Sequence, residues 1–208
     1  MANEVFDLVV RGKAKLVGAA VQEALDNGAD PNELLASMIS AMDEVGEKFK
    51  NNEIFVPEML VSARAMKKGV EVLKPHLASG AAGALGKVII GTVAGDLHDI
   101  GKNLVAMMIE SAGFEVIDLG VDVPKEKFVE TYEANPDTKI IACSALLTTT
   151  MPALRETVAL LNASPFRSNI KVMVGGAPIT QEFCDEVGAD AYTEDAASCA
   201  QKAKELVS

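Results

Sequence analysis

Residues 87–103 read KVIIGTVAGDLHDIGKN, an apolar run that leads into a short polar turn. The Val and Ile residues of the run do not alternate with polar residues, which is typical of a strand buried on both faces. The turn, residues 95–103, carries one of only two histidines in the chain, and an aspartate lies on each side of it. Because a turn needs only glycine and a polar cap, the imidazole and the carboxylates indicate a chemical role.

The alternation of strand and helix continues to the end of the sequence. Further apolar runs are FEVIDLG (114–120), KIIACSA (139–145), IKVMVGG (170–176) and the short DAYT (190–193). Helix-like stretches begin near residues 101, 124, 151, 181 and 195. This alternation predicts an α/β fold with a doubly wound, parallel sheet of five strands. Ligands of such sheets bind beyond the carboxyl ends of the strands, where GDLHDIG, CSALLTTT, GGAP and YTED are expected.

The N-terminal part has a helical period instead. Four amphipathic segments with short connections predict a helical bundle over residues 1–78. Asp30, Pro31 and Glu33 form a capping pattern at the start of the third segment, and Pro57 opens the fourth. The small residues of ASGAAGALG then predict a linker over 79–86, which leaves residues 87–208 for the sheet domain.

Composition narrows the class of function. The chain has 208 residues and a net charge of −11, which argues against nucleic acid and anionic membrane surfaces as partners. No apolar run approaches the roughly 20 residues that span a bilayer. The first residues carry acids where a signal peptide would be basic, so we expect a cytoplasmic protein. Three cysteines without a CxxC pattern indicate neither a disulfide framework nor a zinc knuckle.

Nucleotide binding of the usual kinds is disfavoured. The glycines at 91, 95 and 101 do not fit G-x-G-x-x-G, and GKN lacks the hydroxyl residue of a Walker loop. Asp118, at the end of the second predicted strand, resembles a ribose-binding acid, but that signal alone is weak.

The histidine is more informative. An imidazole can bind a metal through one nitrogen while the other donates to a carboxylate, here Asp96 two residues before His98. One histidine makes a poor metal site unless a macrocycle already holds the metal, which favours a tetrapyrrole-like cofactor. Taken alone, however, Asp96 could cap the helix near Gly101, and His98 could be a solvated surface residue.

Four motifs in order resemble a known family. GDLHDIGKN is similar to the D-x-H-x-x-G signature of cobalamin-binding domains, SALLTTT to their S-x-L segment, and VGGAP to their glycine pair. DEVGEKF and EIFVPEMLVSARAMK resemble the helical cap of methylcobalamin proteins. The chain thus resembles the stand-alone corrinoid proteins of methylamine, methanol, betaine and methoxy-compound methyl transfer. It is also similar to the cobalamin module of cobalamin-dependent methionine synthase, which implies a Rossmann-like (flavodoxin-like) sheet behind the cap.

The resemblance implies roles for individual residues. His98 would be the lower axial ligand of cobalt in place of the cofactor's benzimidazole, Asp96 would accept its other N–H, and Thr150 would complete the relay. The corrin and its nucleotide tail would contact Gly95, Leu97, Asp99, Gly101, Ser144, Leu146, Thr148, Gly175, Gly176 and Ala196. Phe49 and Val56 fall where the cap covers the upper face of the corrin. Without the family, the hydroxyl residues could be ordinary strand ends, and Phe49 could be core packing.

The implied function is that of a non-catalytic methyl carrier. The protein would bind cobalamin base-off/His-on and carry the methyl group as methylcobalamin. A substrate-specific methyltransferase would load it, a second one would pass the methyl group to a thiol or tetrahydrofolate, and a reductive activation protein would restore it. Two alternatives are a cobalamin-binding subunit of an adenosylcobalamin-dependent mutase and a cobalamin-based sensor. The helical bundle argues against the first, and the lack of a DNA-binding helix pair argues against the second. The methyl donor is not encoded here, because the partner enzyme selects it.

Overall fold

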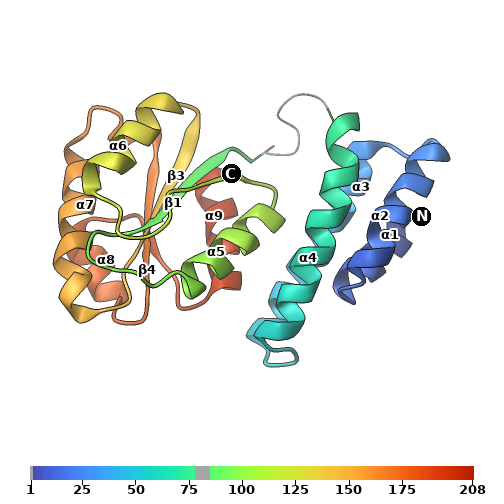
Figure 1. Ribbon diagram of the computed structural model, residues 1–208, viewed down its shortest axis with the longest axis horizontal. Helices are drawn as coiled ribbons and strands as arrows, with labels where there is room; N and C mark the ends of the chain where they lie inside the picture. Colours follow the sequence, from blue (N-terminus) through green and yellow to red (C-terminus); the bar gives the residue numbers. More distant parts are fainter. Residues whose placement is uncertain (1, 78–84) are drawn as a thin grey trace. The chain divides into compact units, whose positions relative to one another are not determined.

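The computed structural model describes residues 2–77 and 85–208 (Figure 1). Contacts divide the chain into two compact units, residues 1–84 with 110–114 and residues 85–109 with 115–208. The predicted linker, 79–86, lies outside the described residues except for its last two positions. The exact domain boundaries therefore stay a prediction.

The first unit is helical. Its elements are α1 (Ala2–Val10), α2 (Ala14–Asp26), α3 (Pro31–Lys50), α4 (Val56–Leu73) and the 3₁₀ turn η1 (Lys74–His76). Within it, α2 packs on α4, α1 packs on α3, and α3 packs on α4. The buried side chains are aliphatic or methionine and include Val5, Val9, Val17, Val21, Leu34, Met38, Met42, Val45, Met59, Met66 and Leu73. The methionines of this unit are therefore core packing.

Caps explain where two of these helices begin. The Asp30 carboxylate accepts the N–H of Asn32 at 2.8 Å, and Pro31 occupies the first turn of α3, as the sequence predicts. The reciprocal bond of a capping box forms in the next helix instead, where Glu58 accepts the N–H of Phe55 at 3.0 Å. The structure starts α4 one residue before Pro57, because proline is tolerated throughout the first turn.

The second unit contains the sheet. Its strands are β1 (Lys87–Thr92), β2 (Glu115–Asp118), β3 (Thr138–Ser144), β4 (Lys171–Gly175) and β5 (Ala191–Tyr192). Every neighbouring pair is parallel, and the strand order is β2-β1-β3-β4-β5. This is the flavodoxin-like order of a doubly wound sheet. The predicted fold class is therefore confirmed.

Helices cover both faces of the sheet. They are α5 (Ile100–Ser111), α6 (Lys125–Ala134), α7 (Met151–Ala163), α8 (Gln181–Val187) and α9 (Ala196–Val207), with the 3₁₀ turns η3 (Thr148–Thr150) and η4 (Arg167–Asn169). Figure 1 shows α6, α7 and α8 on one face and α5 and α9 on the other. Each long helix begins within one residue of its predicted start. Within the described ranges, no helix is long and apolar enough to cross a membrane.

The strand order places a topological switch point at the carboxyl edge of the sheet. After β1 the chain turns to α5 on one face, whereas after β3 it turns to α7 on the opposite face. The two connections therefore diverge between neighbouring strands, which is the topological switch point where open α/β sheets bind ligands. The ends of β1 and β3 lie in register there, with Thr92 opposite Ser144.

Candidate cofactor site

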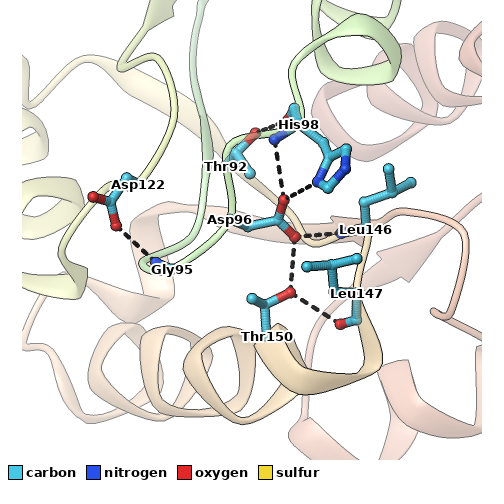
Figure 2. Close-up of polar contacts among 8 residues, drawn as sticks. All are labelled: Thr92, Gly95, Asp96, His98, Asp122, Leu146, Leu147 and Thr150. Carbon is cyan, nitrogen blue, oxygen red and sulfur yellow. Dashed lines mark hydrogen bonds and ion pairs between the residues drawn. The ribbon is translucent and has the colours of Figure 1, made fainter.

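Asp96 lies at the centre of the switch point. Its side chain is fully buried and accepts four hydrogen bonds (Figure 2). Oδ1 accepts the backbone N–H of His98 at 3.1 Å and contacts His98 Nδ1 at 2.7 Å. Oδ2 accepts the N–H of Leu146 at 2.7 Å and the hydroxyl of Thr150 at 2.8 Å. Asp96 thus holds its own turn and the loop after β3, and it does not cap the free N–H groups of α5.

These hydrogen bonds keep the carboxylate ionised. Burial, the largest single influence, raises the pKa of Asp96, but the donors from Leu146, His98 and Thr150 together outweigh it and hold the pKa well below its ordinary range. An ionised carboxylate has no proton to donate. The proton between Asp96 and His98 must therefore be on Nδ1, and in the neutral ring Nε2 keeps its lone pair.

Thr150 links this pair to α7. Its hydroxyl lies 2.8 Å from Asp96 Oδ2 and 2.9 Å from the carbonyl oxygen of Leu147, and the residue is buried. A hydroxyl has one proton, so it donates to one of these two oxygens at a time. The structure thus brings together all three members of the relay suggested by the sequence.

His98 presents its remaining nitrogen to the outside. About half of its side chain is exposed (48%), and Nε2 has no hydrogen-bond partner within the part of the chain that the structure describes. Large apolar side chains are also exposed in the turn after β1, at the start of α5 and in the loop after β3: Leu97, Ile100, Leu146 and Leu147. The sequence predicts Leu97 and Leu146 as cofactor contacts but not Ile100 and Leu147. These two apolar residues stand in the same motifs, HDIG and SALL, and that position is the signal that could have indicated them.

This donor set suits a metal held by a flat macrocycle. Among the described residues, no group of three or more His, Cys, Asp or Glu side chains could enclose a bare metal ion. A single imidazole nitrogen, fixed in direction by a buried carboxylate and flanked by apolar side chains, can instead fill one axial position of a macrocycle. The residues present therefore fit a corrinoid.

The glycine that ends β4 and the glycine that follows it differ in the space around them. At Gly176, with φ +126°, an added Cβ would lie 1.8 Å from the carbonyl oxygen of Ala145, so the backbone contact itself excludes a side chain. At Gly175 an added Cβ would meet nothing within 4 Å. Open space for a ligand therefore lies beside Gly175, and contact of both glycines with the nucleotide tail stays a prediction.

The other proposed cofactor contacts surround the same carboxyl edge. Ser144 ends β3 and is partly buried, Thr148 is exposed in η3, and Ala196 is buried at the first residue of α9. In the turn after β1, Gly95, Asp99 and Gly101 are exposed. Gly95 has φ +80°, which a glycine adopts without strain.

The two remaining positions belong to the helical unit. Phe49 is partly buried in α3, and Val56 is exposed as the first residue of α4. Phe55, which sequence reasoning did not select, is more exposed than Val56, at 64% against 39%. A role of Phe49 and Val56 above the corrin stays a prediction.

Comparison with known proteins identifies the cofactor class. Residues 86–200 match a family model described as a B12 binding domain, and residues 1–74 match a second model with the same description. Dimethylamine corrinoid protein 1 of Methanosarcina acetivorans is 44% identical over 210 residues, covering 100% of this chain and 97% of that protein.

Two solved structures agree with this result. A cobalamin-binding protein from Desulfitobacterium hafniense is 30% identical with a TM-score of 0.84, covering 100% of this chain and 99% of that one. The methanol:cobalamin methyltransferase complex MtaBC from Methanosarcina barkeri contains a chain that is 29% identical with a TM-score of 0.84, covering 98% of this chain and 78% of that one. The chain therefore belongs to the family of B12-binding corrinoid proteins, and its cofactor is a corrinoid.

Proposed function

We propose that the protein carries a methyl group on its corrinoid, with the benzimidazole of the cofactor displaced and His98 Nε2 in its place. The observation that carries this proposal is the Asp96–His98 pair. The 2.7 Å contact occupies Nδ1, directs the ring and leaves Nε2 exposed among apolar side chains. When bound, the cobalt supplies the nucleophile that takes up the methyl group.

The residues of this chain would bind, orient and hold a proton. Asp96 fixes the imidazole and keeps the proton on Nδ1, and Thr150 restrains Asp96 from the opposite side. Open space at Gly175 beside the partly buried Ser144 supports a slot for the displaced nucleotide tail along the end of β3 and β4. The exposed leucines near His98 would exclude water from the lower face of the corrin.

A carrier of this kind needs partner enzymes. Neither Cys143 nor Cys199 offers a nucleophile, because burial raises the pKa of Cys143 to about 12 and that of Cys199 to about 11. A relative is named for dimethylamine, and a structural neighbour belongs to a methanol:cobalamin methyltransferase complex. These names support a substrate-specific methyltransferase as the partner that loads the methyl group from a small methylated compound.

The rest of the cycle is part of the same proposal. A second methyltransferase would remove the methyl group to a thiol or to tetrahydrofolate, and a reductive activation protein would return oxidised cofactor to the active state. We place this cycle in the cytoplasm. The protein itself would be the non-catalytic member of the system.

Electron paramagnetic resonance of the cob(II)alamin form tests the axial ligand directly. Protein labelled with nitrogen-15 histidine should show one strongly coupled nitrogen that responds to the label, and His98→Ala should lose it. The chain offers a matched control, because its second histidine, His76, is exposed in η1 of the helical unit. His76→Ala should keep the coupling. A nitrogen coupling that ignores the histidine label would overturn the proposed ligation.

A further inference from the structure

The turn that carries His98 is held at its beginning by a residue from another segment. Asp122, between β2 and α6, accepts the N–H of Gly95 on Oδ1 at 2.7 Å (Figure 2). Its own N–H donates to the carbonyl oxygen of Asp96 at 2.9 Å. One residue therefore makes both a side-chain and a backbone bond to the two residues that begin the turn.

The backbone of Asp122 is adapted to this double contact. It has φ +53°, the left-handed region, which only one other described non-glycine residue adopts, Asn52. Aspartate and asparagine tolerate this region better than other residues with a Cβ. Glycine would adopt it more readily, but glycine has no side chain to accept the N–H of Gly95.

The far end of the turn is held separately. Lys102 is almost completely buried, and its Nζ contacts the Asp118 carboxylate at 2.7 and 2.5 Å and Asn103 Oδ1 at 2.7 Å. The Asn103 amide donates to Asp99 Oδ2 at 3.0 Å, and the Asn103 N–H donates to the Asp99 carbonyl oxygen at 2.7 Å. Residues 99–103 are thus tied to the end of β2, so loss of Asp122 would release only the beginning of the turn.

We propose that Asp122 is a positioning residue for the axial ligand. The direction of the His98 ring depends on Asp96, and the backbone of Asp96 is held in place by Asp122 from outside the turn. Asp122 does not touch the imidazole, and it would act by limiting the positions that Asp96 and His98 adopt. This inference rests on the proposed function, because it concerns how firmly His98 is offered to cobalt.

Three replacements of Asp122 distinguish the effect of its acceptor oxygen from the effect of its left-handed backbone conformation. Asp122→Asn keeps an oxygen acceptor and tolerates the left-handed conformation. Asp122→Gly suits that conformation but removes the acceptor, and Asp122→Ala removes the acceptor and strains the backbone. Asp190 supplies a control far from the turn, because its carboxylate also accepts a backbone N–H, that of Val172 in β4 at 2.6 Å. Asp190 also pairs with Arg167 at 2.8 Å, so its loss should destabilise the fold at least as much as the loss of Asp122.

The measurement is the ratio of histidine-bound to histidine-free cob(II)alamin, from nitrogen-15 histidine paramagnetic resonance. We expect Asp122→Asn to match wild type and Asp122→Gly to lower the ratio about three- to tenfold, as loss of one ordinary hydrogen bond would. Asp122→Ala should lower it further. Asp190→Gly should reduce the free energy of unfolding without changing the ratio, which distinguishes a positioning role from general destabilisation.

A second measurement needs no cofactor. In cofactor-free protein, exchange of the His98 Nδ1 proton with water, followed by nuclear magnetic resonance, should be faster in Asp122→Gly than in wild type or Asp122→Asn. Equal ratios and equal exchange rates in wild type and Asp122→Gly would overturn the role of Asp122. If wild type itself showed no histidine nitrogen on cobalt, the proposed function would fail instead, and the exchange comparison would still decide whether Asp122 positions His98.

Discussion

At the scale of single residues, the site depends on one ionised carboxylate, that of Asp96, both of whose oxygens are hydrogen-bonded. Asp96 receives two backbone N–H groups, one hydroxyl and one imidazole. An asparagine has the same shape but only one acceptor oxygen, so its NH₂ group would face donors that it cannot pair with. The residue must therefore be an acid, although it is fully buried.

Asp96→Asn should reveal this requirement in the pH dependence of stability. The folded-state pKa of Asp96 lies below its unfolded value, so its stabilisation is fully present above about pH 4, the ordinary range of aspartate, and is lost as the pH falls further. At neutral pH the variant should lose about 2 kcal/mol or more in free energy of unfolding, and this difference should shrink below about pH 4.

Urea unfolding of the cofactor-free protein, followed by circular dichroism at a series of pH values, would measure this difference. A gap between wild type and Asp96→Asn that stayed constant into acid would mean that folding does not depress the pKa of Asp96. Exposed carboxylates such as Glu156 and Glu186 titrate in both proteins, so they cancel in the comparison.

At the scale of elements, an ion pair with a buried lysine ties α5 to the end of β2. The Lys102 side chain is 1% exposed, whereas that of Asp118 is 39% exposed. Desolvating a lysine offsets most of the attraction that it gains from its partner, so such pairs often contribute little to stability compared with an apolar residue of similar size. The pair fixes where the first turn of α5 lies.

Lys102→Met and Lys102→Ala separate charge from packing. We expect Lys102→Met to change the free energy of unfolding by less than about 1.5 kcal/mol, because it fills a similar volume and leaves Asp118 accessible to water. Lys102→Ala should lose more, since it also leaves a cavity. Urea unfolding curves of the cofactor-free proteins would show this order. Equal losses in the two variants would mean that the charge itself stabilises the fold.

The sequence predicts these elements well, because each leaves a local signal. Runs of Val and Ile mark the strands, and the starts of the long helices fall within one residue of their predicted positions. The relay of Asp96, His98 and Thr150 was also identifiable, since each member lies in a motif. The roles of Asp122 and Lys102 leave no such local signal. Asp122 contacts the turn after β1, and Lys102 of α5 contacts the end of β2. Both contacts join segments that are distant in the sequence, so no periodic pattern marks them.

At the scale of the whole molecule, the reactivity of the three cysteines measures the opening of the sheet unit, because all three lie in that unit. Cys143 lies in β3, Cys184 in α8 and Cys199 in α9, and all three are buried. Burial raises the pKa of each thiol. Because the thiolate is the reactive form, alkylation requires the sheet unit to open.

Corrinoid binding should slow that opening by mass action. A ligand that binds only the folded state, at about one hundred times its dissociation constant, stabilises that state by about 2.7 kcal/mol, which corresponds to about a hundredfold fewer open molecules. Alkylation of the three cysteines by iodoacetamide, followed by mass spectrometry with and without bound cob(III)alamin, should slow by about this factor. His98→Ala should show weaker protection, because it keeps the tail slot but loses the axial bond. Unchanged rates on loading would mean that the corrinoid does not hold the sheet unit closed, and the carboxyl-edge site would then be wrong as its principal binding surface.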